Sequence, residues 1–121
     1  MRMYDLIDRP VRELPAFEAA VLARTRRWVH ALTMAGIVAD PEDDAFGMAM
    51  RALDRGSQDL LVIERPCHDV VGETEAVLLG LWRLVRADRI GKADAVASGL
   101  TDADAGRVMV AAMARAVHAI G

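Results

Sequence analysis

The stretch from residue 60 to residue 85, LLVIERPCHDVVGETEAVLLGLWRLV, most constrains what this chain can fold into. It joins a short apolar run to a loop with the only cysteine, and then enters the most apolar helical pattern in the chain. A helix that is apolar on nearly every side belongs in the middle of a protein, with other helices laid around it. The stretch therefore predicts an all-α protein built around a helix from about Glu73 to Ala87.

The length and composition fit one folded domain. A chain of 121 residues can bury roughly two thirds of its unfolded surface without disulfides or metals. Hydrophobic residues make up 54% of it, above the usual range of about 45–50% apolar residues, which argues against disorder. We expect a single helical domain over residues 1–121, with residues 1–13 loosely ordered because Pro10 interrupts any helix there.

Helical spacing and end signals predict the other helices. The first runs from Pro15 to Ala35, with Gly36 just past its end. The second begins at Asp40 and Pro41, which suit the cap and the first turn, and ends near Arg55. The fold class is thus a compact bundle of four to five helices.

Glycines and small residues shape the later helices. Gly47, in the middle of the second helix, is expected to allow a close approach of another helix. A short helix from Lys92 to Ser98 is expected to stop at Gly99, and Thr101 and Asp102 open the last helix.

An apolar run interrupts the helical pattern and predicts an extended segment near 60–65. Its four apolar residues are followed by Pro66, which favours extended backbone just before it. A lone strand has no partner inside a helical domain. It would either cover the core or pair with a second copy of itself across a dimer axis. The predicted dimer segment is Leu60, Leu61, Val62 and Ile63.

Charge and cysteine usage indicate the compartment. The formal charge of −3 gives the protein no electrostatic pull toward nucleic acid or anionic membrane. The longest apolar run, 76–82, is far shorter than the roughly 20 residues of a membrane-spanning helix. The N-terminus shows no secretory signal, and a single cysteine fits a reducing cytoplasm. Abundant alanine and arginine point to a GC-rich bacterial coding sequence.

The loop before the apolar helix carries the densest set of reactive side chains. A thiol just ahead of a helix can act as a nucleophile or redox sensor. Adjacent residues of an extended loop point apart, however, so Cys67 and His68 are poorly placed to activate each other. A structural loop is therefore the favoured interpretation, with Glu73 and Glu75 as solvated carboxylates at the helix start. The candidate ligand or redox residues are Cys67, His68, Asp69 and Trp82.

The sequence contains no residue spacing that is typical of a metal site or a cofactor site. Zinc sites use closely spaced cysteine and histidine pairs, and His30, His68 and His118 are widely separated. No Glu-x-x-His motif supports a di-iron site. We expect no metal and no cofactor.

A small basic patch lies on the first helix beside Trp28. Arg24, Arg26 and Arg27 suit phosphate groups, because the guanidinium forms bidentate contacts. They fall largely off the apolar stripe and fit a solvated face. A helix-turn-helix arrangement is disfavoured, since its second helix would begin Pro-Glu-Asp-Asp and carry negative charge toward phosphates.

The resulting hypotheses belong to three classes. No catalytic motif such as G-x-S-x-G or a Walker A sequence occurs, so no enzyme is predicted. The leading hypothesis is a small cytoplasmic protein that acts by protein–protein interaction or regulation, as a homodimer or with another protein partner. The alternatives are a ligand-binding or redox-responsive protein using the Cys67 and His68 loop, and a nucleic-acid-binding regulator using the arginine patch.

Overall fold

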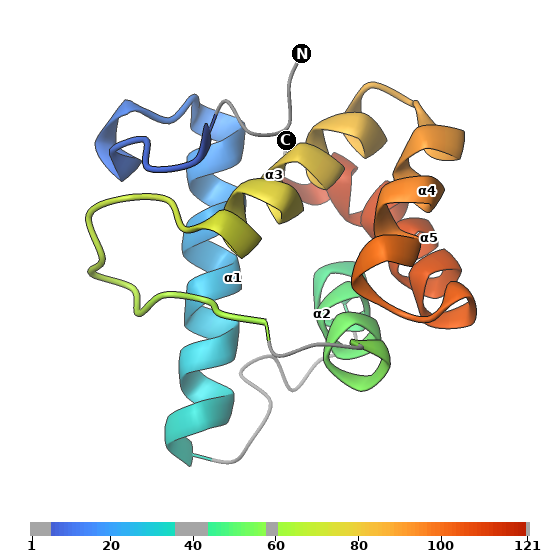
Figure 1. Ribbon diagram of the computed structural model, residues 1–121, viewed down its shortest axis with the longest axis horizontal. Helices are drawn as coiled ribbons and strands as arrows, with labels where there is room; N and C mark the ends of the chain where they lie inside the picture. The colour runs from blue at the N-terminus through green and yellow to red at the C-terminus, as the bar shows by residue number, and fades with distance from the viewer. Residues whose placement is uncertain (1–5, 36–43, 58–60, 121) are drawn as a thin grey trace. The chain divides into compact units, whose positions relative to one another are not determined.

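The computed structural model describes residues 6–35, 44–57 and 61–120. Those ranges contain five α-helices and no strand, which confirms the predicted all-α class (Figure 1). The chain divides into two compact units: Met1–Pro41 with Val62–Gly80, and Glu42–Leu61 with Leu81–Gly121. The prediction of a single domain stays a prediction.

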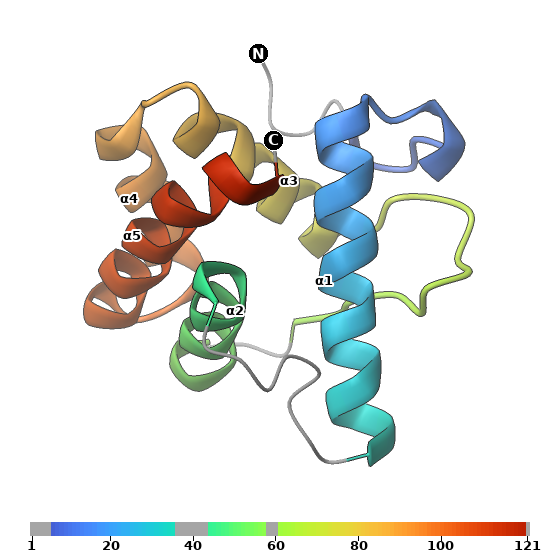
Figure 2. The same cartoon turned by 180° about the vertical axis from the view of Figure 1, so that it is seen from behind.

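The first unit is built on helix α1 (Ala16–Ala35), which follows the predicted range closely. Its apolar stripe is buried as the spacing predicts, with Phe17, Val21 and Leu22 at 6%, 1% and 2% exposure. The short 3-10 helix η2 (Val11–Glu13) precedes it. Figures 1 and 2 both show the loop of residues 62–72 running beside α1.

The segment before α1 pairs with the end of that loop. The N–H groups of Asp8 and Val11 donate to the carbonyls of Val71 and Asp69, at 2.9 and 2.8 Å. The Val71 N–H donates to the Arg9 carbonyl at 3.0 Å. Residues 6–13, expected as a loosely ordered lead-in, are thus bonded to residues 69–71.

Helix α3 (Glu73–Arg86) matches the predicted apolar helix and contributes residues to both units. Its residues are buried on several sides, as the sequence predicts. Those at 5% exposure or less are Glu75, Ala76, Leu78, Leu79, Leu81, Trp82 and Val85.

The second unit packs helix α5 (Ala103–Ile120) against α2 (Ala45–Gly56) and α4 (Ile90–Leu100). The ring of Phe46, on α2, stacks on Trp82, with ring centroids 5.5 Å apart. Further buried residues on α2 and α5 complete this core: Ala49, Met50, Ala52, Leu53, Met109, Val110, Ala112, Met113 and Ala116.

Two predicted helix ends are wrong. Helix α2 begins at Ala45, because Asp44 is the cap and its carboxylate accepts the Gly47 N–H at 2.7 Å. The predicted cap, Asp40, lies outside the described residues. Helix α4 runs through Gly99, and its cap residue Thr101 donates from its N–H to the Ala97 carbonyl at 2.9 Å.

The close helix approach lies at Gly56 instead of Gly47. A Cβ on Gly56 would lie 2.2 Å from the Cβ of Ala105, on helix α5. The atoms nearest to a Cβ on Gly47 would belong to the side chains of Asp44 and Arg51, which come from its own helix and its cap. The small residue is therefore needed at the end of α2.

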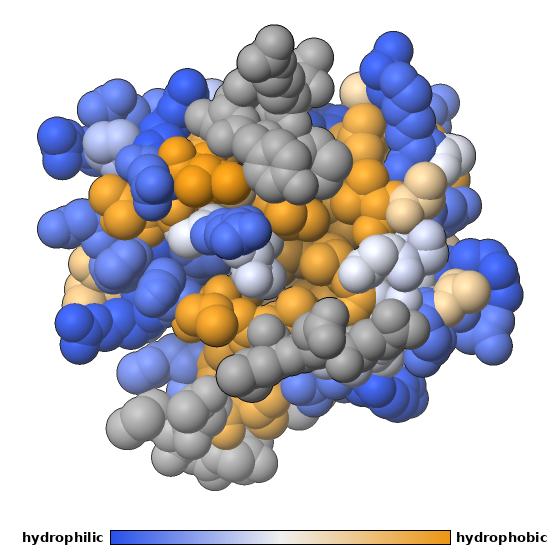
Figure 3. Space-filling view, in the orientation of Figure 1, coloured by the Kyte–Doolittle hydropathy of each residue, from blue (hydrophilic) through white to orange (hydrophobic). Residues whose placement is uncertain are grey.

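Across the described ranges, none of the helices has both the length and the apolar character that crossing a membrane requires. Figure 3 nevertheless shows apolar residues reaching the surface on one face. Two large hydrophobic residues are exposed among those that the structure describes, Val62 at 57% and Val108 at 48%.

Candidate functional site: the 62–72 loop and its buried ion pair

The 62–72 loop has no regular secondary structure. It begins at Val62, the first residue of the second segment of the first unit, and leads into helix α3. A tight turn at Pro66 and Cys67 reverses its direction, closed by the His68 N–H donating to the Arg65 carbonyl at 3.0 Å. Backbone of this kind needs hydrogen-bond partners from elsewhere if it is to keep one conformation.

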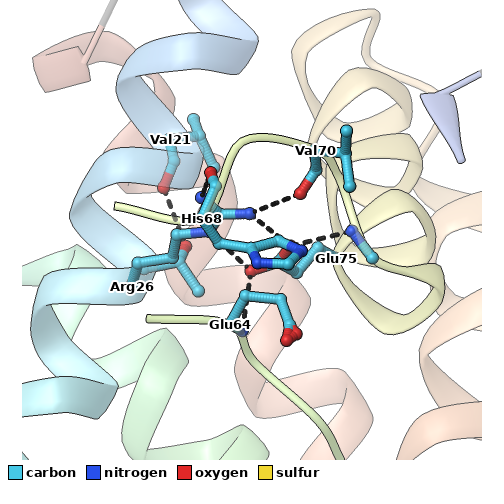
Figure 4. A network of polar contacts seen from close by, with 8 residues as sticks. Val21, Arg26, Glu64, His68, Val70 and Glu75 are labelled. Carbon is cyan, nitrogen blue, oxygen red and sulfur yellow. Dashed lines mark hydrogen bonds and ion pairs between the residues drawn. The ribbon is translucent and has the colours of Figure 1, made fainter. Parts of the chain in front are cut away.

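A buried ion pair beside the loop supplies those partners. The Arg26 Nε and Nη2 atoms each lie 2.8 Å from a Glu75 carboxylate oxygen, so the contact is bidentate (Figure 4). Both residues are only 1% exposed. Arg26 comes from the middle of α1 and Glu75 from the first turn of α3, so the pair links two helices of the first unit.

Arg26 also reaches the loop backbone. Its Nη1 donates to the His68 carbonyl at 2.8 Å, and its Nη2 donates to the Val70 carbonyl at 2.9 Å. All three guanidinium nitrogens thus donate to a carboxylate or a carbonyl. This arrangement uses the planar fork that distinguishes arginine from lysine.

The Glu75 carboxylate accepts hydrogen bonds from two backbone N–H groups of the loop. Its Oε1 accepts the Gly72 N–H at 2.9 Å and its Oε2 accepts the Glu64 N–H at 3.1 Å. The first of these contacts satisfies an N–H at the start of α3, where a negative charge is also favourable for the helix dipole.

The environment fixes the charge of Glu75. Burial by itself raises the pKa of this carboxyl, but the Arg26 hydrogen bonds, the Gly72 N–H, the Arg26 charge and the Glu64 N–H together outweigh it. The net pKa of Glu75 is therefore lowered, and the carboxylate is ionised at neutral pH.

These positions correct two sequence interpretations. Glu75 is not a solvated helix-start carboxylate, and Arg26 is not part of a solvated face. The signal was present in the spacing: Arg26 follows Leu22 by four residues, and Glu75 precedes Leu79 by four. Both charges therefore lie on apolar helix faces, where a residue of opposite charge is the expected companion.

The predicted anion-binding patch loses its central member. Arg26 is buried in the ion pair, while Arg24 is half-buried and Arg27 is exposed. The structure therefore does not present the three guanidinium groups together at the surface. Nucleic-acid binding through Arg24 and Arg27 stays a prediction.

Of the predicted ligand or redox residues, Cys67, His68 and Asp69 lie on the loop of the first unit, and Trp82 does not. Cys67 is an exposed free thiol and Asp69 is exposed, while His68 is half-buried. No side-chain hydrogen bond within the described ranges joins these three residues. Trp82 lies in the second unit, buried and stacked on Phe46.

Metal ligands do not converge in the described part of the chain. No three histidine, cysteine, aspartate or glutamate side chains there are close enough to bind a metal ion together.

The predicted dimer segment is open to solvent at its centre. Val62 is 57% exposed, and Leu61 and Ile63 are half-buried. Leu60 lies outside the described residues. The backbones of Val62 and Ile63 form no hydrogen bond to any other described residue. An apolar stretch whose backbone bonds to none of the described residues therefore precedes the anchored part of the loop directly.

A comparison of the chain with protein-family models, curated proteins and solved structures found no match.

Proposed function

We propose that this is a small non-enzymatic helical protein that works by protein–protein interaction through the 62–72 loop, and that it associates with a second copy of itself. The observation that carries the proposal is Val62, an exposed β-branched side chain whose backbone bonds to no described residue, next to a loop anchored by a buried ion pair.

The unpaired backbone suits pairing with another chain. An open stretch of N–H and C=O groups is a template for an added strand, and the apolar side chains beside it supply contact area. The segment at Val62 and Ile63 offers both. An extended partner segment would satisfy these groups and cover Val62.

The charges of the loop favour a second copy as that partner. Arg65 and Asp69 are both exposed on the same loop and carry opposite charges. A two-fold contact places the same patch of both subunits against each other, so a patch with both signs of charge is complementary to itself.

Prior ordering of the loop reduces the cost of binding. Residues that are already fixed lose little conformational freedom when a partner arrives. Anchored loops on rigid scaffolds are common interaction sites for this reason. The contacts of Arg26 and Glu75 give the 62–72 loop that property.

The test is sedimentation equilibrium of the wild type, Val62→Asp and Val108→Asp over a range of concentrations. Val108 is the matched control: it is the other exposed valine among the residues that the structure describes, and it lines an open hollow of about 490 Å³ at the start of α5 with Arg55 and Asp104. Loss of valine burial and gain of a desolvated charge at Val62 should weaken the dimer by at least about tenfold, while Val108→Asp has no effect.

Two results would contradict the proposal. One is a wild type that stays monomeric up to about 100 µM, a concentration at which even modest specific self-association is visible. The other is a dimer that Val108→Asp dissociates and Val62→Asp does not, which would move the contact to the hollow on α5.

A redox-responsive role of Cys67 is the second candidate, favoured by the exposure of its thiol. Oxidation by a peroxide to the sulfenic acid would add a polar oxygen to the turn of the proposed interaction loop. This candidate predicts that peroxide weakens self-association of the wild type and leaves Cys67→Ser unchanged. If peroxide has the same effect on self-association of the wild type and of Cys67→Ser, the redox-responsive role is wrong.

A further inference from the structure

We infer that Arg26 and Glu75 are positioning residues: the pair sets the conformation of the 62–68 part of the loop, and the helices pack without it. The consequence for binding rests on the proposed function. The consequence for the loop itself stands on the geometry alone.

Apart from the contact between Arg26 and Glu75, the hydrogen bonds of the pair all point to the loop. Within the described part of the chain the pair takes part in six hydrogen bonds, and two of them join Arg26 to Glu75. The other four all go to backbone atoms of residues 64–72: the carbonyls of His68 and Val70, and the N–H groups of Glu64 and Gly72. Beyond each other, these two side chains therefore bond to the loop and to the residue that precedes α3.

Two parts of the loop depend on the pair differently. Residues 69–71 also form three backbone hydrogen bonds with residues 8–11. Glu64 and the His68 carbonyl have no such second anchor within the described ranges. Without the pair, the Glu64 N–H and the His68 carbonyl lose their hydrogen bonds to the helices, whereas Val71 keeps its bond to Arg9.

Burying this ion pair has a cost in free energy. Two charges at 1% exposure forfeit their hydration, and well-packed apolar residues of similar volume often stabilise a protein as well or better. The gain specific to this pair is directional bonding to loop backbone, which apolar residues do not provide.

The experiment compares amide hydrogen exchange of the wild type and the double variant Arg26→Met, Glu75→Met by NMR. The double variant removes both charges at once, so neither is left buried and unpaired. The reporter is the His68 N–H, because its acceptor, the Arg65 carbonyl, is unchanged in the variant. Glu64 is unsuitable as a reporter, since its own acceptor is replaced.

Two controls lie in the same molecule. The Val71 N–H donates to Arg9, and the Asp102 N–H donates to Gly56 in the second unit. We expect exchange at His68 to accelerate by about fivefold or more, and exchange at Val71 and Asp102 to change by less than about twofold.

Unchanged exchange at His68 would overturn the inference, because the loop would then keep its turn without the pair. Equal acceleration at all three amides, or a double variant that fails to fold, would overturn it in the other direction, because the pair would then hold the fold as a whole.

The same variant separates this inference from the proposed function. If the wild type dimerises, the double variant should dimerise about tenfold more weakly, as expected when a preorganised loop must be ordered on binding. If the wild type is monomeric, the proposed function fails and the exchange result still decides the role of the pair.

Discussion

Arg26 and Glu75 place two full charges inside the first unit, and their geometry explains why both remain ionised. Each loses hydration that is worth several kcal/mol in effective terms. Six hydrogen bonds of 2.8–3.1 Å replace it. Neither charge is stable there without the other, which makes the pair a single energetic unit.

Single and double replacements should therefore differ sharply. Arg26→Met leaves a buried carboxylate without its cation, and the free energy of unfolding should fall by about 3–5 kcal/mol. The double variant Arg26→Met, Glu75→Met should recover most of that loss. Urea unfolding followed by circular dichroism measures all of these values. A double variant that loses the sum of the two single effects would show that the residues act independently.

The lowered pKa of Glu75 gives stability a defined pH dependence. Its pKa in the folded protein lies below the unfolded value, near 4.5. The contribution of the pair is therefore fully present above the unfolded pKa and is lost as the pH falls through the folded one. Below pH 4.5 the wild type should lose stability more steeply than the Met double variant, in urea unfolding at matched pH values. Parallel pH profiles would contradict this sign.

At the scale of the elements, close packing makes glycine necessary at one helix end and dispensable at another. The Cβ of Gly56→Ala would lie 2.2 Å from the Cβ of Ala105, so α2 and α5 must move apart. Gly99 is exposed and lies within α4, and a Cβ added to it would have nothing within 4 Å.

Alanine at these two glycines should have opposite effects. Gly56→Ala should lower the free energy of unfolding by about 1–3 kcal/mol through overpacking. Gly99→Ala should raise it by up to about 1 kcal/mol, because alanine is the better helix former. Thermal unfolding of both variants checks whether Gly56→Ala destabilises the protein and Gly99→Ala stabilises it. Stabilisation by Gly56→Ala would mean that the two helices are not in close contact.

The helices differ in how far local pattern predicts them. Helices α1 and α3 are long and their apolar spacing is regular, so sequence pattern alone places them within one residue or so. The start of α2 is not predictable in this way, because Asp40, Asp43 and Asp44 are all plausible caps, and the structure shows Asp44 in that role. The prediction that helix α4 stops at Gly99 is wrong because glycine also occurs inside exposed helices, where it lowers helix stability only modestly.

The candidate site was harder to predict than the helices. The sequence predicts a loop at Cys67, His68 and Asp69, but it does not predict the anchor of that loop, because Arg26 and Glu75 are 49 residues apart and their pairing is a tertiary contact. Helical spacing places each on an apolar face, and pairing them needs the approach of α1 and α3. The exposure of Cys67 depends on the same tertiary contacts.

At the scale of the whole molecule, each unit buries its own apolar residues, and the anchored loop of the first unit presents Val62 to solvent. Self-association through this loop would make the assembled molecule two-fold symmetric. The single native cysteine then lies near the axis in both copies.

That placement allows a direct test by electron–electron double resonance of the wild type with a nitroxide on Cys67. Cys67 is five positions from Val62, so pairing of two copies at Val62 puts the two Cys67 Cα atoms within about 40 Å of each other. We predict a defined distance within that limit, lost on tenfold dilution with unlabelled protein and in labelled Val62→Asp. A labelled wild type at about 100 µM without any dipolar modulation, or with a distance that Val62→Asp leaves in place, would contradict association through this loop.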